Sequence, residues 1–243
     1  MVWYIFINRM FYFDEIQGKK VLKSDILPEL THFFTTRETV IKSKDPEMRE
    51  IVEDNKKLVC EYLNVEELVS PVQTHSDNVG FAQKGILEYP DTDAMILAND
   101  SQAVFLNFAD CTPVILYDKK QKIGAISHAG WRGTVQRIAP KTVKKMNSNP
   151  ADIVAVIGPA ISLCCYNVGE DVFEQLKACV DDFSGLYNGL FVDLKGINAR
   201  QLTEIGVKEI DVCSYCTCCD NDMFFSYRKE NGTTNRHSAV IKL

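Results

Sequence analysis

The sequence predicts an α+β fold, and two observations carry this prediction. The middle of the chain contains short apolar runs separated by polar or turn residues, a pattern typical of strands in a buried sheet. Helical patterns also occur, but they do not alternate with the strand runs as strictly as βαβ units require. The four central strand runs are AMIL at 94–97, AVFLNF at 103–108, PVILYD at 113–118 and KIGAIS at 122–127.

The N-terminal part of the chain predicts strands followed by a helix. Residues 1–18 are apolar, but Asn8 and Arg9 interrupt them, and they lack the basic region and cleavage site of an export signal. We interpret them as a pair of strands. Residues 45–63 open with Asp and Pro in cap and first-turn positions and then repeat apolar residues at helical intervals. They predict an amphipathic surface helix.

The C-terminal half adds further elements of both kinds. Residues 134–147 predict a helix with Thr134 near its start and Lys144 and Lys145 near its end, broken or kinked at Pro140. The remaining predicted elements are a strand at 152–158, helices at 170–180 and 198–207, the latter ending at Gly206, and a strand-rich region at 210–243.

Composition narrows the class of protein. The 243 residues are 46% hydrophobic, and they contain no repeat, low-complexity tract or linker, which indicates one domain over 1–243. The 27 basic and 33 acidic residues are scattered, so we expect neither nucleic acid nor a membrane surface as partner. No apolar run is long enough to span a membrane. Nine cysteines without an export signal indicate free thiols or metal ligands in the reducing cytoplasm.

His75, Cys111 and His128 each lie at the end of an apolar run. Two imidazoles and one thiolate are a suitable ligand set for zinc. The separations are 111 − 75 = 36 and 128 − 111 = 17 residues, so each ligand must come from a different element, as in a catalytic site with an open fourth position. From the spacing alone, an inert core thiol at Cys111 is the favoured interpretation, because a lone cysteine in an apolar run usually has this role.

The other cysteines are interpreted as ordinary reduced thiols. Cys213, Cys216, Cys218 and Cys219 in CSYCTCC include a C-x-x-C pair, which suggests a structural zinc or a redox role. However, no further C-x-x-C occurs elsewhere, and no thioredoxin-like βαβ pattern surrounds this one. The same interpretation applies to Cys164 and Cys165.

Four arginines are candidates for binding a substrate anion. Arg37, Arg132, Arg228 and Arg236 lie beside turn-like or strand-end residues, where a guanidinium can hold phosphate or carboxylate with two hydrogen bonds. Solvated surface arginines remain the alternative. The P-loop, dinucleotide-binding and hydrolase-elbow motifs are absent from the sequence.

Seven motifs in order give the chain a family resemblance that runs from about Arg37 to the C-terminus. The motifs are THSDNV, TDAMIL, ADCTPVILYD, SHAGWRGTV, IGPAISLCCYNVG, DL...NARQL...G and CT...FFSYRKENGTTNR. With these motifs the chain resembles the YfiH-like, laccase-domain proteins, which are associated with purine nucleoside phosphorylase activity.

The resemblance implies layered mixed sheets covered by helices, in an α/β/β/α-like order, and a zinc site at His75, Cys111 and His128. It also implies phosphorolysis of adenosine, inosine and methylthioadenosine to ribose 1-phosphates, together with deamination of adenosine. Purine nucleosides and phosphate are thus the expected partners, while no oligomeric state is predicted.

The sequence departs from the family pattern at two places. The early TTR is usually followed by Gly-Gly, but here Arg37 is followed by Glu38 and Thr39. The late TGR reads Thr-Asn-Arg and ends at Arg236, a mild change because Asn tolerates positive φ. The loop that carries Arg37 is therefore the part of the predicted site that differs most from the family.

These motifs suggest roles for the remaining residues. Arg37 and an arginine of the late segment, Arg228 or Arg236, would bind phosphate. Arg132 would contact a substrate anion or form structural hydrogen bonds. Asp110, next to Cys111, would act in catalysis or orient a metal ligand. Bound zinc would lower the pKa of water to about 7 for attack on purine C6 in deamination.

Three alternatives remain. Copper competes with zinc for a site of two histidines and one cysteine, as a polyphenol oxidoreductase would require. A multicopper laccase is excluded by only 4 histidines and no H-x-H pair. Cys111 could instead be the nucleophile of a cysteine hydrolase, with His128 or His75 as its base. In a non-enzymatic protein, zinc would only join strand ends.

Overall fold

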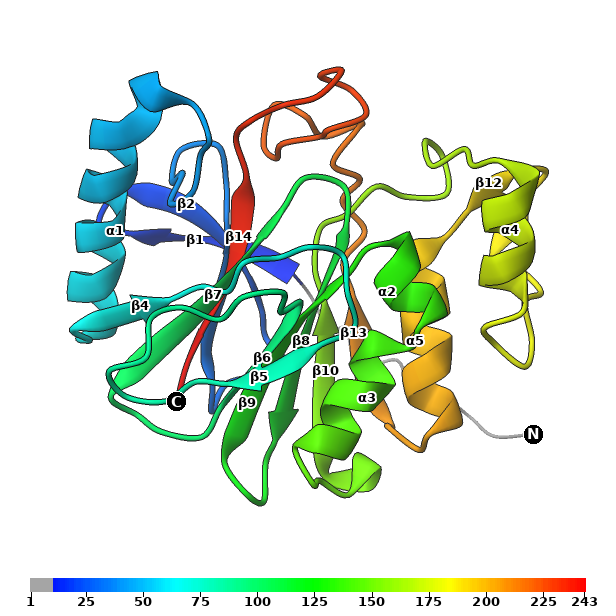
Figure 1. Ribbon diagram of the computed structural model, residues 1–243, viewed down its shortest axis with the longest axis horizontal. Helices are drawn as coiled ribbons and strands as arrows, with labels where there is room; N and C mark the ends of the chain where they lie inside the picture. Colours follow the sequence, from blue (N-terminus) through cyan, green and yellow to red (C-terminus); the bar gives the residue numbers. More distant parts are fainter. Residues whose placement is uncertain (1–10) are drawn as a thin grey trace.

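The strands of the protein form two six-stranded mixed sheets in a computed structural model that describes residues 11–243 (Figure 1). In the first sheet the order is β1-β2-β3-β14-β7-β4, antiparallel except between β4 and β7. The last strand of the chain therefore lies between β3 and β7. The bounds are β1 Phe11–Ile16, β2 Lys19–Ser24, β3 Thr31–Thr35, β4 Glu67–Val69, β7 Gln102–Phe108 and β14 His237–Lys242.

The second sheet has the order β13-β10-β8-β9-β6-β5. Its outer pairs, β13 with β10 and β6 with β5, are parallel, and the inner pairs are antiparallel. The bounds are β5 Val79–Phe81, β6 Ala94–Leu97, β8 Thr112–Asp118, β9 Ile123–Ala129, β10 Ile153–Ile157 and β13 Glu209–Val212; a separate small hairpin is formed by β11 Tyr187–Asn188 and β12 Phe191–Val192.

The two sheets pack face to face around the largest apolar cluster, to which both contribute. Phe34 and Leu106 come from the first sheet, and Ile115 and Val154 from the second. Side chains alternate across a strand, so the neighbours of these residues point to the opposite faces. On those outer faces the first sheet packs against α1 (Arg49–Leu63), and the second packs against α3 (Ile138–Lys145) and α5 (Leu194–Glu204). The predicted α+β class and its α/β/β/α layering are confirmed.

The helices follow largely from local signals. The predicted helix at 45–63 is a 3₁₀ turn at Pro46–Met48 followed by α1. The side chain of Asp45 caps the 3₁₀ turn by accepting a hydrogen bond from the backbone amide of Glu47. Helix α1 ends at Asn64, whose φ is 52°. The helices are α1 Arg49–Leu63, α2 Trp131–Val135, α3 Ile138–Lys145, α4 Glu170–Lys177 and α5 Leu194–Glu204, with a further 3₁₀ turn at Pro150–Asp152. None of them has the length and apolar character needed to cross a bilayer.

The predicted helix at 134–147 is two helices. Gln136 and Arg137 separate α2 from α3, and Arg137 has a φ of 58°, which a continuous helix does not allow. Pro140 is not the break, because it lies in the first turn of α3, where its missing amide hydrogen costs no internal hydrogen bond.

The prediction of a strand-rich region at 210–243 is wrong for most of its length. Between β13 and β14 the backbone forms local turns, with the amide of Asp220 bonded to the carbonyl of Cys216 and that of Glu230 to Ser226. These local bonds replace a sheet ladder. For the predicted strand pair at residues 1–18, β1 covers the described part, and residues 1–10 lie outside the described residues.

Candidate metal centre

The structure brings His75, Cys111 and His128 together at one end of the second sheet. His75 lies on the loop before β5, Cys111 at the turn between β7 and β8, and His128 near the end of β9. One ligand atom from each lies within 4.8 Å of the others. Sγ of Cys111 is 3.8 Å from Nε2 of His75, and the two imidazole rings are 4.9 Å apart. Residues far apart in sequence thus share one small volume.

The pairing of β8 with β9 explains the position of Cys111. Pro113 lies opposite His128 in this antiparallel pair, so Cys111, two residues earlier, falls beside Gly130. A Cβ atom on Gly130 would lie 3.0 Å from Sγ of Cys111 and 3.1 Å from the ring of His75. Glycine at this position therefore lets the chain pass close to two of the three donors.

Asp93 is the residue that holds two of the donors in place, and the sequence analysis did not identify it. Its side chain is fully buried and accepts hydrogen bonds from the backbone amides of Thr74, His75 and Ser76, at 3.0, 3.1 and 2.8 Å. The other important contact is 2.7 Å to Nδ1 of His128. The only signal in the sequence was a carboxylate directly before the apolar run of TDAMIL.

Charge pairing within the centre shifts the protonation of its groups. Burial opposes ionisation of Cys111, but the charge of His128 and hydrogen bonds to His128 and His75 lower the pKa of the thiol to about 6. Burial likewise opposes the charged form of His128, but Cys111 and Asp93 raise its pKa to about 9. Both shifts favour the charged forms, because the Cys111 thiolate and the His128 imidazolium stabilise each other.

These residues fit a tetrahedral metal ion. Zinc takes nitrogen and thiolate sulfur as ligands, and catalytic zinc sites use three protein ligands. The bond from Nδ1 of His128 to Asp93 leaves Nε2 available as the donor, an arrangement typical of metal-bound histidine. The lowered pKa of Cys111 supplies the thiolate.

The three donors line a cavity of about 660 Å³ that is also lined by positively charged side chains. Lys42, Lys44, Arg228 and Arg236 lie on its wall together with Asp110. The sequence analysis named the two arginines but missed the lysines. The remaining lining residues are Ser70, Pro71, Val72, Gln73, Asn107, Ala109, Ile161, Tyr166, Tyr227 and Thr234.

Arg37 and Arg132 are not brought into this wall. The guanidinium of Arg37 lies 2.5 Å from Glu230, donates to the carbonyl of Asn221 and stacks over Phe225. Arg132 is exposed in α2 and stacks on Trp131, with 4.3 Å between guanidinium and ring centre. The Arg37 guanidinium is therefore already paired with the carboxylate of Glu230.

Asp110 is adjacent to Cys111 but contacts other groups. Its carboxylate accepts hydrogen bonds from the hydroxyl of Thr217 and from the backbone amide of Arg228, both at 2.7 Å. Asp110 itself has a φ of 84°. The carboxylate that contacts His128 is Asp93.

Comparison with solved structures agrees with this architecture. The crystal structure of the hypothetical protein YfiH from Bacillus licheniformis superimposes with a TM-score of 0.86 over 95% of this chain and 98% of its own, at 29% identity. A purine nucleoside phosphorylase of Clostridium acetobutylicum is 34% identical over 78% of this chain and 83% of its own length. An adenosine deaminase RL5 from an unknown prokaryotic organism is 32% identical over 69% of this chain and 71% of its own.

Fold and site together define an α+β protein with two packed sheets and a histidine and cysteine cluster at a sheet end. The family model described as multi-copper polyphenol oxidoreductase laccase matches residues 32–243, and the chain belongs to this family. The resemblance noted in the sequence is thereby confirmed, and the relatives include enzymes named for phosphorolysis and for deamination.

Proposed function

We propose that the protein is a zinc-dependent purine nucleoside phosphorylase that acts on adenosine, inosine and methylthioadenosine, with adenosine deamination as a second reaction. The observation that carries the proposal is a single cavity that combines three metal-ligand side chains, four cations and two tyrosines. The names of the related enzymes support the same substrate class.

The cations would form the phosphate site. Arg228 and Arg236 are the principal candidates, because guanidinium groups hold phosphate with paired hydrogen bonds. Burial lowers the pKa of Arg236, so an anion bound beside it would offset the cost of burying its charge. Asp110 lies on the same wall, where its oxygens accept hydrogen bonds from the Thr217 hydroxyl and the Arg228 amide.

In the proposed reaction a phosphate oxygen attacks C1′ of the nucleoside and the C1′–N9 bond breaks. Its electron pair leaves with the base, which takes up a proton, and the products are the free base and the 1-phosphate of the sugar, which is ribose for adenosine and inosine and 5-methylthioribose for methylthioadenosine. Burial raises the pKa of Tyr166, so its phenol stays a neutral hydroxyl donor toward the substrate. Zinc held by His75, Cys111 and His128 would supply Lewis acidity, toward phosphate in phosphorolysis and toward water in deamination.

The roles of the remaining candidates follow from their contacts. We propose that Arg37 is a positioning residue, which fixes the segment that carries Arg228 through its bonds to Glu230 and Asn221. Asp110 would position the same segment through the amide of Arg228. Arg132 stays a predicted contact for a substrate anion.

A copper oxidoreductase is a weaker candidate because of the ligand count. Of the four histidines, only His75 and His128 belong to the centre. His32 instead bonds the amide of Ser24 and the carbonyl of Leu30, and His237 is buried between aromatic rings. A single copper ion can still replace zinc, because Cu²⁺ binds such ligands more tightly.

One observation favours a cysteine hydrolase as the second candidate. Asp93, His128 and Cys111 form a carboxylate, imidazole and thiolate series like that of thiol enzymes. Alkylation of Cys111 by iodoacetamide separates the two functions. A metal ligand is protected by saturating zinc, whereas equal reaction with and without zinc would contradict the metal assignment.

The decisive experiment is to incubate zinc-loaded protein with each of the three nucleosides, with and without phosphate, and to identify the products by mass. We expect free base and ribose 1-phosphate, or 5-methylthioribose 1-phosphate from methylthioadenosine, only when phosphate is present. Absence of product from all three would refute the proposal. Arg228→Gln should raise the KM for phosphate about tenfold, and Arg200→Gln, whose guanidinium bonds Asp182 instead, is the matched control.

A further inference from the structure

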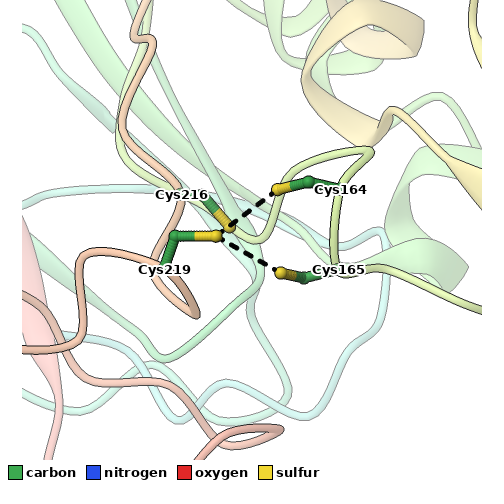
Figure 2. Close-up of side chains that lie close together, drawn as sticks. All are labelled: Cys164, Cys165, Cys216 and Cys219. Atoms are coloured by element: carbon green, nitrogen blue, oxygen red, sulfur yellow. Dashed lines mark hydrogen bonds between the residues drawn. The ribbon is translucent and has the colours of Figure 1, made fainter.

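A second cluster of sulfur atoms lies outside the cavity and has no part in the proposed reaction. It is formed by Cys164, Cys165, Cys216 and Cys219, whose side chains point toward one another (Figure 2). The first two lie in the segment after β10, and the other two in the turns between β13 and β14. The sequence pattern alone had suggested ordinary reduced thiols here.

The distances within this four-cysteine cluster match those of a metal site. Sγ of Cys219 is 3.6 Å from Sγ of Cys164 and 3.4 Å from Sγ of Cys165, and all four sulfurs lie within 4.8 Å of one another. Four thiolates at about 2.3 Å from one zinc ion are roughly 3.8 Å apart at the corners of a tetrahedron. Disulfide-bonded sulfurs lie at about 2.05 Å, so these contacts are not disulfides.

Backbone amides around Cys216 donate hydrogen bonds to its sulfur. The amide of Ser162 donates to Sγ of Cys216 at 3.4 Å. The backbone amides of Cys218 and Cys219 also donate hydrogen bonds to this sulfur. Amides that converge on the first sulfur of a C-x-x-C turn stabilise the charge that a metal ligand must carry.

The two segments that carry the cysteines are also joined by their backbones. Ala160 and Cys216 form an isolated parallel bridge, and the amide of Thr217 donates to the carbonyl of Ala160 at 3.1 Å. Each segment therefore offers two sulfurs at a fixed place. Cys213 is buried away from the group, so only part of CSYCTCC takes part.

The joined segments both reach the cavity of the candidate metal centre. Tyr166 directly follows Cys165, while Tyr227 and Arg228 follow the turn that contains Cys219. Thr217, between the two cysteines of that turn, donates its hydroxyl to Asp110. A link between the segments would therefore fix neighbouring parts of the cavity wall, where the Arg228 guanidinium donates to the carbonyl of Asn167 and lies over the ring of Tyr166.

We propose that Cys164, Cys165, Cys216 and Cys219 form a second zinc site, separate from His75, Cys111 and His128. It is a closed tetrathiolate that fastens the segment after β10 to the segment before β14. Its role is structural, because four protein ligands leave no position for a substrate.

The test counts metal ions and reports their ligands in the reduced full-length chain. A His75→Ala, His128→Ala double variant removes the first centre. We expect it to retain one zinc per chain and, after Co²⁺ replaces zinc, to show the strong sulfur-to-cobalt charge transfer of a four-sulfur site. A Cys164→Ser, Cys219→Ser double variant should lose that ion and signal, while Cys60→Ser, whose thiol lies outside the cluster, should keep both.

A second measurement covers the case in which a variant does not fold. In the wild-type chain, zinc should protect all four cysteines from iodoacetamide at least tenfold, whereas Cys60 should react at an unchanged rate; peptide mass identifies each site. Equal alkylation with and without zinc would overturn the proposal. So would a disulfide among the four in anaerobically prepared protein, or a histidine double variant that binds no metal.

Discussion

The two sulfur-containing clusters of the molecule differ in how their candidate metal-binding side chains are held. His75, Cys111 and His128 come from three separate elements, and the carboxylate of Asp93 fixes two of them. The four cysteines come as two sequence pairs on neighbouring segments, and backbone amides point at one of their sulfurs. Three ligands with a supporting carboxylate suit a site open to substrate, whereas four thiolates suit a closed structural site.

The largest effect is expected from His128→Ala, which removes one of only three ligands. We expect the protein to stay folded, to lose its zinc at the first centre and to lose at least about 100-fold in kcat/KM. Metal analysis and product formation measure the two effects, and circular dichroism controls for folding. Full zinc occupancy of both sites in this variant would refute the ligand set.

The Cys164→Ser, Cys219→Ser variant should act on stability instead. Loss of an ion that binds only the folded chain removes about 2.7 kcal/mol when its concentration is 100 times Kd. The corresponding loss in Tm is roughly 5–10 °C for a chain of this size. Thermal unfolding with zinc present measures it, with Cys60→Ser as control. An unchanged Tm would mean that the cluster does not stabilise the fold.

Asp93→Asn should weaken the first centre without removing a ligand. The amide cannot accept all the bonds that the carboxylate accepts from the loop at residues 74–76 and from His128. We expect zinc affinity at this centre to fall about 10- to 100-fold. Competition with a chelator measures the change, and the cobalt signal of the four-cysteine cluster should not respond. Asp54→Asn, an exposed carboxylate on α1 that pairs with Lys57, is a control for general effects of charge.

Gly130→Ala should have a smaller effect on the same centre. The added methyl group would lie 3.0 Å from Sγ of Cys111, so the thiol or the ring of His75 must move by a few tenths of an ångström. We expect about a tenfold loss of zinc affinity. Gly85→Ala, where no atom lies within 4 Å of the added Cβ but φ is +80°, would show a backbone effect without the change in metal binding.

The smallest effect concerns His237, a buried histidine without the charge partners of His128. The rings of His128 and His237 both pack against Phe108. Burial lowers the pKa of His237 to about 3. In the unfolded chain the His237 imidazole takes up a proton below pH 6.5, whereas in the folded state its lowered pKa keeps it neutral. The free energy of unfolding is therefore undiminished above pH 6.5 and decreases as the pH falls below that value. The loss is about 1 kcal/mol between pH 6.5 and 5.5. In His237→Phe, denaturant unfolding should therefore depend less steeply on pH; an unchanged slope would contradict this burial effect.

The parts of the molecule that could be predicted from sequence are those set by local patterns. The apolar runs at 94–97, 103–108 and 113–118 are strands β6, β7 and β8, and the capped helical pattern at 45–63 contains α1. The break between α2 and α3 was assigned to Pro140, because the positive φ of Arg137 leaves no clear trace in sequence.

The supporting groups of the two clusters depend on contacts between distant residues. Asp93 is 35 positions from His128, and nothing in TDAMIL states which side chain it will meet. Cys165 and Cys219 are 54 positions apart and meet only because Ala160 and Cys216 pair. Positions at the ends of apolar runs and the resemblance to a family both predicted the first set of candidate ligands, whereas the second set could be recognised only from the fold.

The central place of β14 in the first sheet has a consequence for biosynthesis. Residues 237–242 leave the ribosome after every other strand described, yet they lie between β3 and β7. Until β14 emerges, no strand joins β1, β2 and β3 to β7 and β4. The sheet that begins first is therefore completed last, and the early strands must wait, unpaired on one edge, through most of translation.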